Sequence, residues 1–229
     1  MVSSFFFIFF FSPHSELLLT FQEEIIPLTK SLLLSFNDDP LFNYFYPKGP
    51  KPGEMKEDFM KIHSRRLKEA RINGTLIKLS TDIEGKNEDK FSGFAMIYTY
   101  PQRFSLAVFA QNLLFYSVNR LSPPSNEGQD MGRLETFFKL HDKYFDEAKA
   151  RFNGNFVYLE VIAVVPTKQG LGLGKKLMQY IMEFANERPM FLECTDISNV
   201  KFYQKYGFKV FGEELLDDDK TKITFMLKE

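Results

Sequence analysis

Alternating glycines mark the segment of this chain that is best suited to hold an anion. Gly170, Gly172 and Gly174 follow the apolar run Val157–Val165, which Pro166 ends, and precede apolar residues at helical spacing. A buried strand, a glycine turn and a helix in this order aim unpaired backbone N–H groups at a phosphate. Glycines also let the phosphate approach the backbone, because no side chain stands in between. The segment therefore predicts a phosphate-binding site.

Two familiar phosphate-binding patterns fit this segment poorly. The phosphate loop of nucleotide triphosphatases needs Gly, four residues, then Gly-Lys-Ser/Thr, but Lys176 follows Gly174-Lys175 and Gln169 replaces the first glycine. A dinucleotide fingerprint needs a third glycine where Lys175 stands, although Glu193 lies at the distance expected of its ribose-binding acid. A nicotinamide-dependent oxidoreductase is therefore a disfavoured alternative.

A third pattern fits better, and a second motif accompanies it. The pattern is Gln/Arg-x-x-Gly-x-Gly/Ala after a strand that closes with Val-x-Pro; the second motif is an Asn, a Tyr four positions later, and Gly-Phe. The matching residues are Gln169, Gly172 and Gly174 in the first motif, and Asn199, Tyr203, Gly207 and Phe208 in the second. From Phe156 onward the chain resembles the GCN5-related N-acetyltransferases, the GNAT family. The Leu76–Tyr98 segment and residues 36–40 resemble that family more loosely.

The resemblance implies an α/β (α+β) fold: a single GNAT-type domain with a mixed, mostly antiparallel sheet and helices on both faces. We expect residues 16–229 to form this domain and residues 1–15 to form a disordered or loosely packed tail. Residues 102–152 exceed the direct connection of a minimal family member, which predicts a two-helix insertion between strands 3 and 4. The insertion would lie near the acceptor site or form the surface of a homodimer.

The periodicity of apolar residues places the individual elements. Strands are expected at Leu17–Phe21, Thr75–Thr81, Phe91–Tyr100, Val157–Val165, Met190–Cys194, Phe208–Leu216 and Thr221–Lys228. Helices are expected at 23–36, from Asp39-Pro40, at Glu54–Ile72, at Gln102–Asn119, at Arg133–Phe152, after the glycines, and from a Ser198 cap to Tyr206. We expect Gln102–Asn119 to be buried because it is strongly apolar, Arg65 and Arg66 to face solvent, and a polar turn around Gly85 and Asn87.

The resemblance also implies where acetyl-CoA binds. It would lie between the strands Val161–Val165 and Met190–Cys194, which part from each other, and its pantetheine would pair with the backbone of Ile162 and Val164. Its pyrophosphate would lie on backbone N–H groups of the turn, and Gln169 would contribute its side chain or fix the turn. The residues implied in cofactor binding are Ile162, Val164, Gln169, Gly170, Gly172, Gly174, Lys175, Asn199 and Tyr203.

Three residues are candidates for catalysis. Tyr203 matches the tyrosine that acts as general acid in the family, since a positioned phenol with a pKa of ~10 can protonate a departing thiolate. Glu160 lies two residues from Tyr158 and so shares its strand face, where a carboxylate in an apolar run indicates either a base or a salt bridge. Glu193, on the next strand, is the other candidate base. Ordinary packing of Tyr203 is the alternative to its catalytic role, and Phe156, where other members carry His, leaves a histidine base unsupported.

The composition excludes several classes of function. With 229 residues and a net charge of −1, the chain shows no basic excess that would favour a nucleic-acid partner. The single cysteine, Cys194, suits a reducing compartment and hence the cytoplasm, and its place in an apolar strand predicts a packed thiol. The three histidines lack the spacing of a metal site, so we expect no metal cofactor, and no segment is long enough to predict a membrane span.

These observations predict one activity and one alternative. We expect an acetyl-CoA-dependent N-acyltransferase that moves an acetyl group to a primary amine of a small molecule or peptide, by direct attack of the amine on the thioester. The alternative is a non-catalytic acyl-CoA-binding module, which would bind acetyl-CoA without turnover.

Overall fold

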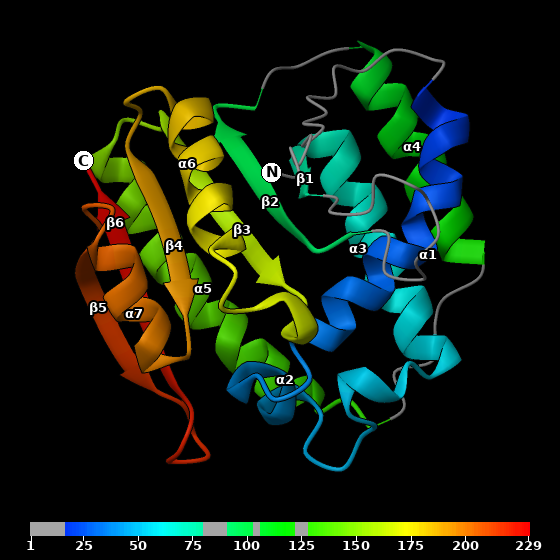
Figure 1. The fold of residues 1–229 in the computed structure, drawn as a ribbon, viewed down its shortest axis with the longest axis horizontal. Coiled ribbons are helices and arrows are strands. Elements are labelled where there is room, and N and C mark those ends of the chain that lie inside the picture. The colour runs from blue at the N-terminus through cyan, green and yellow to red at the C-terminus, as the bar shows by residue number, and fades with distance from the viewer. Residues whose placement is uncertain (1–16, 80–90, 103–105, 122–127) are drawn as a thin grey trace, which may run out of the picture.

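A six-stranded sheet runs through the computed structural model of this chain, which describes residues 17–79, 91–102, 106–121 and 128–229 (Figure 1). The strands are β1 Thr75–Leu79, β2 Gly93–Tyr100, β3 Phe156–Val164, β4 Met190–Cys194, β5 Lys209–Leu215 and β6 Lys222–Lys228. The α-helices are α1 Leu17–Ser35, α2 Pro40–Phe45, α3 Glu57–Asn73, α4 Leu106–Leu121, α5 Met131–Arg151, α6 Leu173–Ala185 and α7 Ile197–Gln204. Short 3-10 turns lie at Pro52–Glu54 and Pro166–Lys168.

The sheet has the order β1-β2-β3-β4-β6-β5 and is antiparallel except between β3 and β4. That parallel pair is short: Val157 pairs with Met190 and Tyr158 with Phe191, and the strands then separate. On its other edge, β3 pairs with β2 as far as Val164. The second half of β3 therefore has one paired and one free edge, as the sequence predicted for these two strands.

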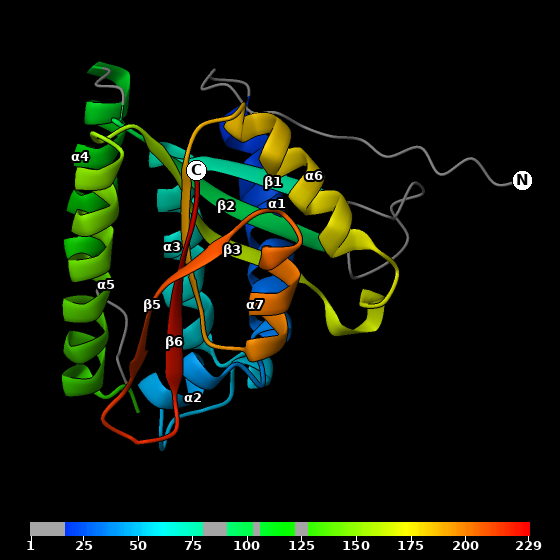
Figure 2. The ribbon, with the colours of Figure 1, turned by 90° about the vertical axis from the view of Figure 1, so that its left-hand side faces the viewer.

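Helices cover both faces of the sheet, as Figure 2 shows with α6 and α7 on one side and α4 and α5 on the other. Because side chains alternate along a strand, successive residues of β3 enter different cores. Leu159 packs with α6 and α7, whereas Tyr158 packs with α5. The pairing of β3 with β2 skips Glu160, and this bulge turns Val161 to the core of α1 and α3, on the other face from Leu159. The mixed, mostly antiparallel sheet covered on both faces confirms the predicted fold class.

Helix α5 is held against the sheet by aromatic packing. Tyr144 stacks on Phe225 of β6 with ring centroids 4.1 Å apart, and its hydroxyl donates a hydrogen bond of 2.8 Å to Glu214. Gly212 of β5 lies beneath this ring at a bulge, where a Cβ atom would stand 2.1 Å from Tyr144 Cε1. The glycine is therefore required for the close approach of helix and strand.

The prediction of a strand at Leu17–Phe21 is wrong, because these residues form the beginning of α1. Farther along the helix, Ile25, Leu28 and Leu32 recur at helical spacing and are buried against α3 and the sheet. Leucine is a strong helix former, so a short leucine run joined to such a pattern extends the helix. Because the first predicted strand does not exist, the predicted strands 3 and 4 are β2 and β3 of the observed sheet. The helices α4 and α5 lie between them.

The expectation that Gln102–Asn119 is buried is also wrong. The helix forms as α4, but Leu113 and Leu114 are 61% and 66% exposed, and Phe109 is 56% exposed. The helix contacts α3 on one side, and its apolar composition alone did not show that its other side faces outward. None of the described helices combines the length and apolarity that crossing a bilayer requires.

Other expectations fall outside the described residues or differ only in detail. The tail at 1–15 and the turn around Gly85 and Asn87 lie outside them. The start of α2 is confirmed, since Asp39 accepts hydrogen bonds from the N–H groups of Leu41 and Phe42. The cap of α7 is Asp196 rather than Ser198, because the Asp196 carboxylate accepts from the Ser198 N–H.

We expect Gly212→Ala to lower the free energy of unfolding by about 1–3 kcal/mol, because the new methyl group displaces the Tyr144 ring. Gly132→Ala is the matched control, since its Cβ would have only Asp130 Oδ1 near it, at 3.4 Å. Urea denaturation of both variants measures the difference. Equal stability of Gly212→Ala and the control would contradict the docking of α5 described above.

Candidate functional site

The turn after β3 has a backbone that glycine makes possible. Gly170 and Gly172 have φ angles of 77° and 76°, in the left-handed region that disfavours other residues. Gly172 is also the N-cap of α6, and no atom lies within 4 Å of the position that a Cβ would take at either glycine. The turn thus presents uncovered backbone at the positive end of a helix.

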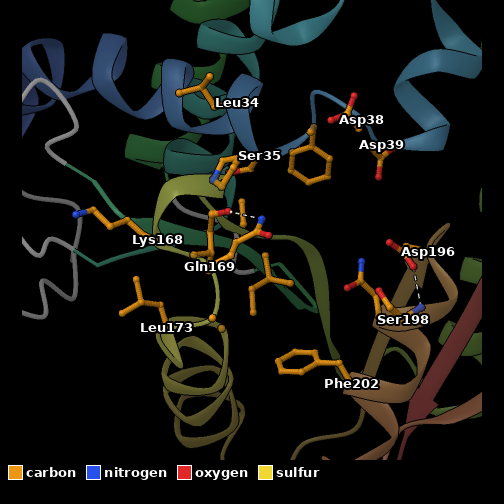
Figure 3. A pocket seen from close by; sticks show the side chains of 18 of the residues that line it. Leu34, Ser35, Asp38, Asp39, Lys168, Gln169, Leu173, Asp196, Ser198 and Phe202 are labelled. Carbon is orange, nitrogen blue, oxygen red and sulfur yellow. Dashed lines mark hydrogen bonds between the residues drawn. The ribbon is translucent and has the colours of Figure 1, made fainter.

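The side chain of Gln169 fastens the turn to the strand. Its Nε2 donates a hydrogen bond of 3.1 Å to the carbonyl of Val164, the last residue of β3 (Figure 3). Of the two roles expected for Gln169, this geometry corresponds to fixing the turn. It also occupies one acceptor on the edge of β3 that was expected to receive pantetheine.

A cavity of about 800 Å³ opens in front of the turn. Figure 3 shows side chains around this space from the end of α1, the turn and α7, among them Ser35, Gln169 and Phe202. All the residues expected to bind the cofactor line it: Ile162, Val164, Gln169, Gly170, Gly172, Gly174, Lys175, Asn199 and Tyr203. The structure therefore brings this set together around one space, which we call the first cavity.

A second cavity, of about 500 Å³, adjoins the first where β3 and β4 separate, and Ile162, Glu193 and Cys194 of these strands line it. Both cavities are lined by Phe36, Asp39, Ile162, Asn199 and Tyr203. The remaining wall of the second cavity is largely aromatic and comes mainly from α2, α3 and α5; it includes Phe42, Phe45, Tyr46, Phe137 and Phe138. The candidate catalytic residues Tyr203, Glu160 and Glu193 all line this second cavity.

Glu193 stands at the centre of a hydrogen-bonded group in the second cavity. Its Oε1 accepts a hydrogen bond of 2.6 Å from the Tyr158 hydroxyl and lies 3.5 Å from His141 Nδ1. Its Oε2 is buried and has no hydrogen-bond partner in the part of the chain that the structure describes. A buried carboxylate oxygen left in this way is costly, so the site is suited to a cationic or hydrogen-bond-donating ligand.

Glu160 is paired differently. Its Oε1 accepts hydrogen bonds from both Nε and Nη2 of Arg66, at 2.9 Å and 2.6 Å. The expectation that Arg66 faces solvent is only partly right: its side chain is 38% exposed, but its guanidinium binds Glu160 on the sheet. Glu160 Oε2 is likewise buried without a partner among the described residues. Arg66 and Glu160 line both the second cavity and a third one of about 520 Å³.

The second cavity is also lined by two histidines whose pKa values are shifted in opposite directions. Burial, together with the positive charge of Arg66, lowers the pKa of His63 to about 3, so this ring is neutral. Burial also acts against protonation of His141, but its contact with Glu193 outweighs this and raises the pKa of His141 above the usual value. The sequence offered no signal for either histidine, because α3 and α5 carry them in polar, helical patterns far from the motifs.

Tyr203, on α7, lies where the two cavities meet and is 6% exposed. Burial raises the pKa of its hydroxyl, and the negative charges that Cys194 and Glu193 can carry act in the same direction. The phenol therefore stays protonated, as a proton donor must. Burial likewise raises the pKa of the Cys194 thiol to about 12, which makes it a poor nucleophile.

Asp39 is a further residue of the site that the sequence placed only as a helix cap. Burial raises the pKa of its carboxyl, although hydrogen bonds from the N–H groups of α2 oppose the shift. Thr195 donates a hydrogen bond of 3.4 Å to its Oδ2. Asp39 therefore links α2 to the end of β4 at the junction of the two cavities. No group of His, Cys, Asp and Glu among the described residues is arranged to hold a metal ion.

Comparisons with known proteins find the same fold in acetyltransferases. Residues 135–210 match the family model described as "Acetyltransferase (GNAT) domain". The fold is similar to that of a histone acetyltransferase HPA2-related acetyltransferase from Corynebacterium glutamicum, with a TM-score of 0.59, 18% identity, and coverage of 90% of this chain and 91% of that one. It is also similar to arylalkylamine N-acetyltransferase 2 from Aedes aegypti, with a TM-score of 0.61, 16% identity and coverage of 97% and 98%. An agmatine N-acetyltransferase is also similar, with a TM-score of 0.56, 13% identity, and coverage of 96% of this chain and 98% of that one. No curated protein sequence matches the chain.

We expect Arg66→Met to lower the free energy of unfolding by about 1–3 kcal/mol at neutral pH, because it leaves the Glu160 carboxylate without its partner. Solvent reaches Arg66, which limits the loss. Adding Glu160→Gln to this variant should recover part of the stability, since the remaining amide is uncharged. Urea denaturation of the single and double variants checks both statements.

Lys61→Met is the control for that comparison. Lys61 lies on the same helix and pairs with Glu57 at 2.8 Å, but both side chains are at least half exposed. Removing the exposed pair should leave stability almost unchanged. If the two methionine variants were equally stable, the Arg66–Glu160 pair would be no more than a surface contact.

Proposed function

We propose that this chain, of which residues 135–210 match an acetyltransferase (GNAT) domain, transfers the acetyl group of acetyl-CoA to a primary amine of a small molecule or peptide. The observation that carries the proposal is the glycine turn in front of the first cavity, which adjoins a second, carboxylate-lined cavity where β3 and β4 separate. This arrangement supports one space for a phosphate-bearing cosubstrate and one for its acceptor. The cytoplasmic location and a homodimer remain predictions from the sequence.

The first cavity fits the chemistry of coenzyme A. The backbone N–H groups of Gly170 to Lys175 would receive the pyrophosphate, because the glycines leave them uncovered. The free edge of β3 at Ile162 would pair with pantetheine, in the manner of an added strand. Asn199, in the first turn of α7, would contribute a side-chain hydrogen bond to the same arm.

The second cavity fits an amine. Glu160 and Glu193 each carry a buried oxygen without a partner among the described residues, and an ammonium group would supply the missing hydrogen bonds. The aromatic wall from α2 and α5 favours an acceptor with an apolar or aromatic body. The structural neighbours named for arylalkylamine and agmatine acetylation support a small amine as the acceptor.

An acceptor bound as an ammonium ion first loses one proton to solvent to become a nucleophile. The neutral amine then loses a second proton as the amide forms, and one proton must reach the thiolate. The amine nitrogen bonds to the thioester carbonyl carbon, the carbon–sulfur bond breaks, and we assign the Tyr203 hydroxyl as donor to the sulfur. Its raised pKa keeps the proton available until negative charge develops on the sulfur. Of the two candidate carboxylates, Glu193 is better placed to assist proton removal, because Glu160 already pairs with Arg66.

We expect Gly172→Ala to weaken acetyl-CoA binding roughly tenfold, a loss of about 1.4 kcal/mol, since the new methyl group stands between the pyrophosphate and the turn. Gly154→Ala is the matched control. Gly154 has a similar φ of 71° and equally open surroundings, but it lies outside the first cavity. Isothermal titration calorimetry measures both affinities, and equal affinities would remove the turn from the cosubstrate site.

We expect Tyr203→Phe to lower kcat on the order of 10²-fold with acetyl-CoA affinity nearly unchanged, because it removes the donor and keeps the ring. Tyr206→Phe is the control, since Tyr206 packs on Phe202 but lines neither cavity. Steady-state kinetics and titration calorimetry separate the two effects. A fall in affinity with little change in kcat would give Tyr203 a packing role instead.

The activity itself is tested by thermal shift with acetyl-CoA, followed by thiol-release assays on pooled primary amines. We expect stabilisation by acetyl-CoA and thiol release that depends on the amine. Stabilisation without release from any pool would favour the non-catalytic acyl-CoA-binding module. Stabilisation by NAD instead of acetyl-CoA would favour the nicotinamide-dependent alternative.

A further inference from the structure

His141 is the one titratable side chain that the inserted helix α5 brings to the carboxylates of the second cavity, among the residues that the structure describes. It is 15% exposed and its ring packs between Phe137 and Phe145 of the same helix, which fix its orientation. We propose that His141, oriented by Glu193, accepts the proton that the acceptor amine gives up during acetyl transfer. This inference rests on the function proposed above.

The geometry assigns different tasks to the two ring nitrogens. Nδ1 lies 3.5 Å from Glu193 Oε1, within ion-pair distance, and has no hydrogen-bond partner among the described residues. Because the ring nitrogens point in different directions, this leaves Nε2 as the nitrogen available to a ligand. The Tyr158 hydroxyl holds the same Glu193 oxygen at 2.6 Å, so the carboxylate cannot turn away without losing that bond. Glu193 is therefore a positioning residue, and His141 is the group that meets the amine.

The charges around His141 favour its protonated form once it has taken up a proton. Glu193 on β4 and Glu160 on β3 are negative, and Asp142, next to it on α5, adds a third negative charge. Arg66 on α3 is the opposing cation, and it is engaged with Glu160. Tyr158 is neutral, since burial raises the pKa of its hydroxyl and the carboxylates near it act in the same direction. The balance stabilises an imidazolium formed in the reaction.

His63 shows why this role belongs to one histidine and not the other. It also lines the second cavity, but neither of its ring nitrogens has a hydrogen-bond partner among the described residues. It packs between Phe42 and Phe59, and its charged neighbour is the cation Arg66. A ring in this environment resists protonation, so it is a poor proton acceptor.

The amine nitrogen forms a bond to the carbonyl carbon of the thioester, and the carbon–sulfur bond breaks. His141 Nε2 takes the proton that nitrogen loses, and Tyr203 gives one to the thiolate. Exchange with solvent then restores the neutral imidazole and the phenol.

The first test is the pH dependence of kcat/KM for the amine. A base must be neutral to act, so the rate should fall as pH drops through the pKa of His141. We expect His141→Gln to lower kcat/KM on the order of 10²-fold at neutral pH and to abolish this acidic limb. Glu193→Gln should move the limb to lower pH, because the negative charge that raises the pKa of His141 is gone.

Asp142→Asn is the control for Glu193→Gln. Asp142 is an exposed neighbour on α5 that acts on His141 only through its charge. Its replacement should move the acidic limb much less and leave kcat unchanged. The acetyl-CoA affinity of all variants should equal that of the wild type, which shows that each has folded with the first cavity intact.

A second readout does not depend on catalysis. The chain has three histidines, so NMR titration of the protein labelled in its imidazole rings gives three resolvable curves, assigned by single His→Gln variants. We expect the His141 curve to have its midpoint above the usual value and to shift downward in Glu193→Gln, while His63 remains unprotonated to low pH. In the wild type, the His141 midpoint should coincide with the acidic limb of kcat/KM.

The possible failures are distinguishable. A wild-type protein that binds acetyl-CoA but acetylates no amine would overturn both the proposed function and this assignment. An active wild type whose acidic limb is unchanged in His141→Gln would overturn the assignment alone. A His141 midpoint that does not move in Glu193→Gln would overturn the positioning role of Glu193.

Discussion

The separation of β3 and β4 is the constraint on which the rest of the site depends. The two strands pair only at Val157–Met190 and Tyr158–Phe191, so backbone groups in the second half of β3 lose their partners on one edge. Buried backbone groups must be satisfied, and Gln169 satisfies only the carbonyl of Val164. The edge that remains is suited to an extended ligand. The separation of β3 and β4 thus leaves a strand edge free for a ligand and lies where the two cavities adjoin.

Much of the site could be predicted from the sequence because its parts are close together in the chain. The glycine turn needs residues that tolerate positive φ directly after a strand and before a helix, and those residues are visible as a spacing. Asn199 and Tyr203 are placed by a second local motif on a short helix. Strand alternation was enough to place Tyr158 and Glu160 on one face of β3.

The parts that could not be predicted depend on contacts between distant elements. Arg66 resembled a solvated residue because α3 is charged on several sides, and only the packing of α3 on the sheet turns it toward Glu160. His141 carried no signal, because its partner Glu193 lies 52 positions away and the contact exists only when α5 docks. The start of α1 and the exposure of α4 were misjudged for a related reason: apolar composition does not show which neighbours a segment will meet.

The site is divided between two parts of the fold that differ in their connection to the sheet. The first cavity is built by the end of β3, the glycine turn and α7, whereas α2, α3 and α5 supply most of the wall of the second. Helix α5 rests on β6 through Tyr144 and supplies none of the described residues that line the first cavity. Under the proposed function, substitutions on α5 would therefore change the preference for the acceptor while the residues around the glycine turn stay the same.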